Sequence, residues 1–227
     1  AKVICYVTMN PDHGLVREHI RAGGRACALE AGVNGQMITL YDKGSHIPLM
    51  WTHLIPATLE CKAMHNVQNA MFAASMAFSL GVSLDSIRQG LRTFDTSFFQ
   101  APGRMNVYSE HPFKVILDYG HNAHAVGVMT DLIQRMDVAN RKVVVLAAPG
   151  DRRDEDILDI ADVVTGKYDV YVLKRDDGLR GRDGDEVPRL LAERLKANGV
   201  PEAAIHVIPD EQQAIDAALN MAEAGDL

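Results

Sequence analysis

The stretch Lys114-Val115-Ile116-Leu117-Asp118-Tyr119-Gly120-His121-Asn122 is the most informative in this chain. An apolar strand runs directly into a carboxylate, a glycine, an imidazole and an amide. In open parallel sheets, ligands bind beyond the carboxyl ends of the strands, where the loops that follow them gather. The stretch therefore predicts a polar site at the carboxyl edge of a parallel sheet and indicates part of an enzyme.

The second half of the chain has the alternation of an α/β fold. Short apolar strands are predicted at residues 115–117, 143–147, 170–173 and 205–208. Amphipathic helices are predicted at about residues 123–136, 155–164, 186–197 and 210–224. Such alternation forms βαβ units with right-handed crossovers and a parallel sheet covered on both faces. We therefore predict a doubly wound, Rossmann-like α/β domain.

The first half has a different pattern. Strands are predicted at residues 25–30, 36–41 and 46–50, with hairpin turns at Asn34-Gly35 and Asp42-Lys43-Gly44. A helix at about residues 11–21 precedes them, and helices at about 66–80 and 84–92, the latter capped by Ser83, follow. This antiparallel part ends before a loop at 95–102. We predict two domains, residues 1–95 and 96–227.

The composition excludes several classes of protein. A net charge of −7 argues against non-specific nucleic-acid binding, and no apolar run is long enough to span a membrane. The widely spaced Cys5, Cys27 and Cys61 fit reduced thiols, so a cytoplasmic location is expected. A strand-like start at Ala1 and a closing Gly225-Asp226-Leu227 after a helix suggest a fragment of a longer enzyme that lacks its last strand or strands.

Charged side chains follow the next two predicted strands. The first group is Asp151, Arg152, Arg153 and Asp154, and the second includes Asp177, Arg180 and Arg182. Arginine binds carboxylate or phosphate with two parallel hydrogen bonds, so converging loops of this kind suit a ligand with both charge signs. Each loop taken alone is better explained as a solvated surface, and it is the predicted convergence of three such loops that favours a site.

Two further features are ambiguous from the residues alone. Asn66 and Asn69 share a helix face and could bind an adenine edge, although Asn66 could simply cap the helix. Arg104, after Pro102-Gly103, could meet phosphate or be an ordinary surface residue. The histidines lack metal-ligand spacing, and we assign no metal to them. No GxxxxGK[ST], GxGxxG or GxSxG motif occurs.

The ordered set of motifs resembles the Mur ligase and folylpolyglutamate synthetase superfamily over essentially the whole chain. The motifs are residues 65–70, Pro102-Gly103-Arg104, residues 118–122 and residues 150–154. Within that superfamily, Gly23-Gly24-Arg25, residues 55–58 and 150–157, and residues 179–182 are most similar to a branch that builds an Asp–Arg polymer. Residues 1–95 would then be the tail of the central ATP-binding domain, and 96–227 most of the carboxyl-terminal domain.

The resemblance implies an ATP-dependent ligase that forms an amide through an acyl phosphate. By motif position, Asn66 and Asn69 would face adenine, Arg104 the phosphates and Asp118 the ribose, with His121 and Asn122 beside it. Arg104 and His121 would be catalytic. Residues Asp151, Arg152, Arg153, Asp154, Asp177, Arg180 and Arg182 would bind the amino-acid substrate. The expected cofactors are ATP and Mg²⁺, the latter with ligands upstream of this chain.

The resemblance also implies partners and limits. Arginine would be joined to the aspartate side chain of an Asp-containing polymer by a full-length protein that forms a homo-oligomer. Gly120 and Ala123 depart from the alanine and proline of the family's DYAHNP pattern, and the phosphate loop is missing. The isolated chain is therefore expected to be inactive. The alternatives are a non-catalytic binding or assembly module of a degenerate homologue, and an NAD- or flavin-dependent α/β enzyme.

Overall fold

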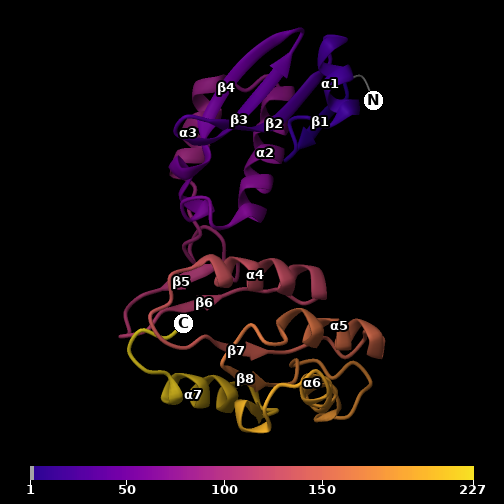
Figure 1. The fold of residues 1–227 in the computed structure, drawn as a ribbon, viewed down its shortest axis with the longest axis vertical. Helices are drawn as coiled ribbons and strands as arrows, with labels where there is room; N and C mark the ends of the chain where they lie inside the picture. Colours follow the sequence, from indigo (N-terminus) through magenta and orange to yellow (C-terminus); the bar gives the residue numbers. More distant parts are fainter. Residues whose placement is uncertain (1–2) are drawn as a thin grey trace. The chain divides into compact units, whose positions relative to one another are not determined.

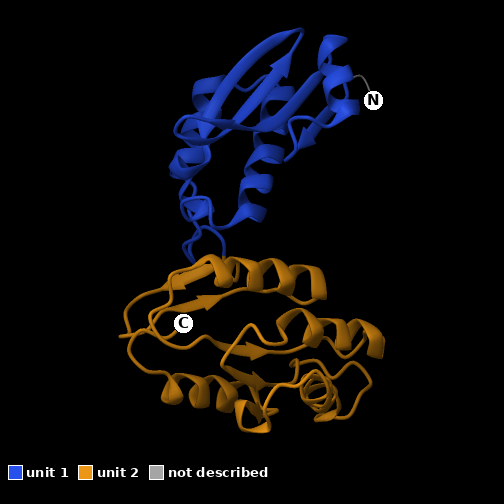
Figure 2. Cartoon of the chain, in the orientation of Figure 1, with its two compact units in different colours: residues 1–101 blue, residues 102–227 orange. Residues whose placement is uncertain are grey.

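The computed structural model describes residues 3–227. The chain divides into two compact units, residues 1–101 and 102–227 (Figure 2). Each unit has its own apolar core and is described by itself. Within the described residues, no helix is both long enough and apolar enough to cross a membrane.

The first unit is built on a mixed four-stranded sheet with the order β1-β2-β3-β4 (Figure 1). The strands are β1 (Cys5–Thr8), β2 (Arg25–Gly32), β3 (Gly35–Asp42) and β4 (Ser45–Trp51). The predicted antiparallel arrangement is confirmed for β2, β3 and β4, whereas β1 pairs with β2 in parallel. The β2–β3 turn falls at Val33-Asn34, one residue before the predicted Asn34-Gly35, because Gly32 pairs with Gly35.

Three helices accompany this sheet, namely α1 (Gly14–Arg21), α2 (Met64–Ser79) and α3 (Leu84–Thr93). Short 3₁₀ turns at Thr52–Leu54 and Pro56–Thr58 lead from β4 to α2. The predicted cap is confirmed, since the Ser83 hydroxyl accepts a hydrogen bond from the Ser86 backbone N–H. The core consists of side chains from one sheet face packed against α2 and α3, such as Ile38, Leu40, Met71 and Ile87. Burial of these apolar side chains is the main stabilising contribution.

The second unit contains a three-stranded parallel sheet with the order β7-β8-β9. Its strands are β7 (Val143–Leu146), β8 (Val170–Leu173) and β9 (Ile205–Val207). The helices are α4 (Ala123–Arg135), α5 (Asp154–Val164), α6 (Glu186–Ala197) and α7 (Glu211–Met221), with a 3₁₀ turn at Glu202–Ala204. Helices α4, α5 and α6 contribute to one core with Tyr171 and Leu173, whereas Val172 packs with Ala214 and Ala218 of α7. Successive β8 side chains thus point to opposite faces, which confirms the doubly wound α/β class.

Strand β6 (Val115–Leu117) exists as predicted, but its pairing differs from the prediction. It pairs antiparallel with β5 (Asn106–Tyr108), a strand that the sequence analysis missed, and it is not hydrogen-bonded to the parallel sheet. A three-residue strand is too short to show a period-two pattern, which explains the omission. The first residue of β5, Asn106, is buried, and its side-chain oxygen accepts a hydrogen bond from the Gly103 N–H.

The segment Gly225–Leu227 runs between the beginnings of β6 and β7. The Asp226 carbonyl accepts a hydrogen bond from the Lys114 N–H at 3.1 Å, and the Leu227 carbonyl accepts one from the Val143 N–H at 2.7 Å. Asp226 is buried, with 3% of the residue exposed. Its carboxylate accepts hydrogen bonds from the guanidinium and from the backbone N–H of Arg141. This buried pair holds the segment in place and ties the two-stranded and three-stranded sheets together.

Candidate ligand site at the carboxyl edge of the parallel sheet

Arg182 connects the loop after β8 to the loop after β7. Its Nε donates to the Gly150 carbonyl at 2.9 Å, and its Nη2 donates to the Arg152 carbonyl and to Asp154, both at 2.7 Å. Its Nη1 donates to Glu186 at the start of α6. The side chain is only 17% exposed, and the hydrogen bond to Asp154 raises its pKa. Arg182 therefore holds the two loops together and has little capacity left for a substrate.

Arg180 forms a second link between the same loops, but on the surface. Its guanidinium lies 2.9 Å from Asp151 and 3.7 Å from Asp176, and the Arg180 and Asp151 side chains are 45% and 46% exposed. The hydrogen bond from Arg180 lowers the pKa of Asp151. Exposed ion pairs are weak because water competes for both charges. A zwitterion could replace this pair without leaving either charge unpartnered.

These two arginines are expected to differ in their contribution to stability. Arg182→Leu leaves two carbonyls and two carboxylates without a donor, so the free energy of unfolding of the second unit should fall by about 2 kcal/mol. Arg180→Leu should change it little, because Arg180 is exposed. Denaturant unfolding followed by hydrogen exchange of peptides from residues 102–227 measures the difference. Equal losses in both variants would contradict the assignment of Arg182 as the structural link.

The remaining charged side chains of these loops lie farther out. Arg153 precedes α5 and is bound to Asp156 on the same helix, at 2.8 Å, so it stabilises the first turn. Arg152 and Asp177 are exposed and form no ion pair with any other residue in 3–227. Of the predicted substrate-binding set, the structure thus leaves Arg152 and Asp177 free and pairs the others internally.

Two hydrogen bonds join the loop after β6 to the Pro102-Gly103-Arg104 turn. An Asp118 carboxylate oxygen accepts a hydrogen bond from the Met105 N–H at 3.0 Å, and the Tyr119 N–H donates to the Gly103 carbonyl at 2.8 Å. Gly103 has a φ of 67°, a left-handed conformation that glycine adopts without strain. These bonds place Arg104 beside the residues that follow β6, as the motif order predicts.

The guanidinium of Arg104 is exposed and lies over the Tyr119 ring, 5.6 Å from the ring centroid. Within the described part of the chain it forms no ion pair. His121 donates from Nδ1 to the Tyr119 carbonyl at 3.1 Å, which leaves Nε2 of the neutral ring as an acceptor. Asn122 caps α4 by accepting the Ala125 N–H at 2.9 Å, so part of its polar capacity is used structurally.

The structure joins the loops after β7 and β8 directly. The hydrogen bond to Asp151 is the main cause that raises the pKa of Arg180, and the two residues come from the loops after β7 and β8. The loop after β6 is joined to the Pro102-Gly103-Arg104 turn instead, and β6 pairs with β5 rather than with the parallel sheet.

The two predicted adenine residues belong to the first unit. Asn66 lies in the first turn of α2 and donates from its amide to the Ala57 carbonyl at 2.8 Å, while Ala63 occupies the N-cap position. Asn69 donates to the Asn66 side-chain oxygen at 3.1 Å. The shared helix face is therefore confirmed, and Asn66 orients Asn69. The capping role considered for Asn66 is wrong.

The hollows of the second unit are small or lie away from these loops. A hollow of about 10 Å³ lies between the loops after β7 and β8, beside Gly150 and Arg182, and has room for about one water molecule. A larger hollow of about 300 Å³ lies at the carboxyl ends of α5 and α6, beside Tyr168 and Asn198. It contains none of the predicted site residues. Volume alone therefore does not identify the site, which is an exposed surface between loops.

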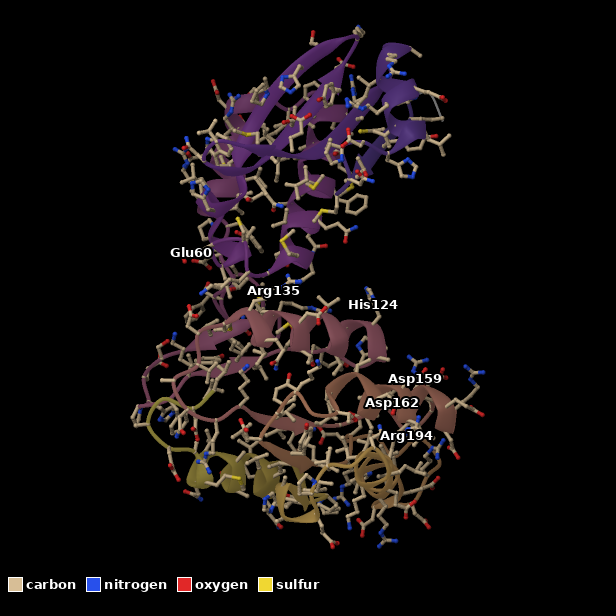
Figure 3. The ribbon with its side chains drawn as sticks, in the orientation of Figure 1. Glu60, His124, Arg135, Asp159, Asp162 and Arg194 are labelled. Atoms are coloured by element: carbon tan, nitrogen blue, oxygen red, sulfur yellow. The ribbon has the colours of Figure 1, made fainter. Side chains whose placement is uncertain are left out.

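A bidentate ion pair outside this site was missed by the sequence analysis. Arg194 of α6 binds both oxygens of Asp162 of α5, at 2.6 and 2.8 Å, and Figure 3 shows the two side chains pointing toward one another. Hydrogen bonds from Arg194, and then from Asn198, lower the pKa of Asp162. The pair braces two neighbouring helices. Because its members are 32 residues apart in the sequence, no local pattern could reveal it.

A comparison with protein families defines the class of this chain. The family model described as "Mur ligase, glutamate ligase domain" matches residues 103–227, more than half of the chain. The chain belongs to the Mur ligase family.

Solved structures agree at the level of fold. Folylpolyglutamate synthase of Mycobacterium tuberculosis, solved with ADP, has a TM-score of 0.59 at 18% identity and covers 96% of this chain and 47% of that chain. A murein peptide ligase of Psychrobacter arcticus has a TM-score of 0.60 at 16% identity, over 100% of this chain and 47% of that chain.

Curated relatives narrow the similarity within the family. Cyanophycin synthetase of Trichormus variabilis is 37% identical over 99% of this chain, and that of Synechocystis is 33% identical over 97%. The chain spans 24% of the length of each. A UDP-N-acetylmuramoyl-L-alanyl-D-glutamate–2,6-diaminopimelate ligase of Caldanaerobacter subterraneus is 29% identical, over 75% of this chain and 33% of its own length.

Proposed function

We propose that this chain is part of an ATP-dependent amide ligase of the cyanophycin synthetase type. In this proposal the complete enzyme phosphorylates the aspartate side chain of an Asp–Arg polymer, and the amine of arginine attacks the acyl phosphate to form an amide and release phosphate. The similarity to cyanophycin synthetases over nearly the whole chain supports this choice within the family. The enzyme would act in the cytoplasm as a homo-oligomer.

The observation that carries the proposal is the contrast between the arginines of the site. Arg180 and Arg182 are neutralised by carboxylates, whereas the exposed guanidiniums of Arg104 and Arg152 have no ion-pair partner within residues 3–227, and Arg104 is the one that lies beside the residues after β6. A free guanidinium suits phosphate oxygens, on which negative charge is concentrated during phosphoryl transfer. Asp118 and His121 follow β6 next to it, in the positions expected for ribose and phosphate contacts.

The Arg180–Asp151 pair supports an amino acid as the second substrate. We expect the substrate carboxylate to bind Arg180 and a cationic group of the substrate to bind Asp151, so that the internal pair is exchanged for a zwitterion. Asp177, which is exposed and has no ion-pair partner in 3–227, offers a further carboxylate. A substrate with a cationic side chain would keep both Arg180 and Asp151 partnered after the exchange, which favours arginine or lysine over a neutral amino acid.

The proposed enzyme requires Mg²⁺ and a phosphate-binding loop, and the described residues supply neither the loop nor a recognisable metal site. In the part of the chain that the structure describes, no cluster of His, Cys, Asp or Glu side chains could hold a metal ion. Mg²⁺ in nucleotide sites is usually held by one or two carboxylates together with phosphate oxygens, and in the proposal these carboxylates lie upstream of this chain. The absence of a GxxxxGK[ST] motif also keeps a second candidate function open, a non-catalytic nucleotide- or substrate-binding module.

The test is a ligation assay with the complete polypeptide that contains this chain. ADP release is measured with ATP, an Asp-containing primer and a panel of arginine, lysine and neutral amino acids. The proposal predicts ADP release that requires both primer and arginine, with one amide formed per ADP, and no amide formation by residues 1–227 alone. Nucleotide binding without amide formation would favour the non-catalytic module, and ligation of neutral amino acids would refute the charge argument.

A further inference from the structure

Tyr119 has a position that packing does not explain. Its side chain is 64% exposed, although it lies between the functional residues Asp118 and His121. Within residues 3–227 its hydroxyl forms no hydrogen bond, and only its backbone groups are hydrogen-bonded. Single exposed aromatic residues are common on protein surfaces, so the neighbours of Tyr119, and not its exposure, must indicate a role.

The groups around Tyr119 are those of the proposed site. The Arg104 guanidinium lies over its ring, 5.6 Å from the centroid, within the range of a cation–π interaction. The His121 ring is tilted against it with 5.6 Å between centroids. The Tyr119 ring thus touches two side chains, Arg104 and His121, that are proposed to lie near the phosphates.

Within residues 3–227, no hydrogen bond or ion pair orients the Arg104 guanidinium, so the Tyr119 ring is the group that can support it. The backbone around it is fixed by the hydrogen bonds of Gly103, Met105 and Asn106. Beyond the backbone, a long arginine side chain loses considerable rotamer entropy when it is held in one geometry. A flat ring beneath the guanidinium reduces this cost and leaves the edge with its N–H donors free for an anion.

We propose that Tyr119 is a positioning residue that holds Arg104 ready for phosphate. The proposal rests on the proposed function, in which Arg104 binds the phosphates of ATP, and it adds a residue to which no role was assigned. The ring provides the support, so phenylalanine should replace tyrosine at this position. Leucine, which is apolar but has no π-face, should not.

The test uses residues 1–227 and inorganic triphosphate as the probe. The Nε–Hε signal of Arg104, identified by its loss in Arg104→Met, is followed by NMR during the titration, and its ¹⁵N relaxation is measured without ligand. We expect wild type and Tyr119→Phe to bind triphosphate equally. Tyr119→Leu should bind it about two- to five-fold more weakly and show a more mobile Arg104 side chain. Unchanged melting temperatures would exclude a folding defect.

The outcomes separate this inference from the proposed function. If Tyr119→Leu leaves both affinity and Arg104 mobility unchanged while Arg104→Met abolishes binding, the positioning role is wrong and the phosphate role of Arg104 stands. If Arg104→Met binds triphosphate as well as wild type, the phosphate role fails. No perturbation of the Arg104 signal in wild type would overturn both, because a guanidinium that meets no anion needs no positioning.

Discussion

Replacement of Arg104 by methionine is expected to lower kcat/KM of the complete ligase about 100-fold. In the proposed mechanism its guanidinium meets negative charge that grows on the phosphate oxygens, so its loss removes stabilisation that is strongest in the transition state. Arg104→Lys should recover only part of the activity, because an ammonium keeps the charge but cannot form two parallel hydrogen bonds. The measurement is steady-state ADP release at varied ATP concentration.

The matched control is Arg189→Met on α6. Arg189 is also an exposed arginine of the second unit, but it is bound to Asp185 on the surface and is not part of the candidate site. Its replacement should change kcat/KM less than two-fold, as is usual for surface residues far from the chemistry. Similar losses for Arg104→Met and Arg189→Met would show that net charge, rather than the position of Arg104, determines activity.

Asp226→Ala is expected to lower the free energy of unfolding of the second unit by about 3 kcal/mol. The Asp226 side chain is 1% exposed and binds Arg141 at 2.8 Å, and it also accepts the backbone N–H groups of Arg141 and Glu223. Removing this buried carboxylate leaves the Arg141 and Glu223 backbone N–H groups without their acceptor and takes away the nearer of the two carboxylates that bind the Arg141 guanidinium. Hydrogen exchange of peptides from residues 102–227 measures the loss. Fluorescence of Trp51, the only tryptophan, follows the first unit.

The control for this variant is Asp216→Ala on the exposed face of α7, where Asp216 accepts one hydrogen bond from Gln212. Its effect should be below about 0.5 kcal/mol. A loss for Asp226→Ala as small as that of the control would mean that the buried pair does not hold residues 225–227 in place.

The same pair gives a pH dependence with a defined sign. Burial raises the pKa of Asp226, but hydrogen bonds from Arg141 and from the Glu223 and Arg141 backbones outweigh it, so the pKa is lowered overall. A carboxyl group with a lowered folded-state pKa stabilises the fold above its unfolded pKa of about 3.9, and this stability is lost as the pH falls through the folded pKa. Wild type should therefore lose more stability than Asp226→Ala on acidification below about pH 4.

Local patterns were sufficient for most of the secondary structure. The βαβ rhythm predicted β7, β8 and β9 and the helices between them, and the Asn34-Gly35 turn with its flanking alternation predicted the β2–β3 hairpin. These signals are contained within a few residues, because side-chain period and turn conformation are local properties. The three-residue strand β5 carries no such signal, and its pairing with β6 could not be predicted.

The candidate site was only partly predictable for the same reason. The charged residues at strand ends could be named, but their partners could not. Only the fold brings Arg182 to the Gly150 and Arg152 carbonyls, 30 or more residues away, and only the fold shows that Arg180 is paired and Arg104 is not. Which arginine is structural and which is available therefore depends on tertiary contacts.

The order of residues in this chain determined its family, its α/β class and the positions of its functional motifs, since each of these depends on neighbours along the backbone. The folded structure decided the antiparallel β5–β6 pair, the buried Asp226–Arg141 link and the contact of Tyr119 with Arg104. Burial and charge pairing between distant segments exist only after the chain has closed its loops, because the partners are brought within range by packing rather than by sequence distance.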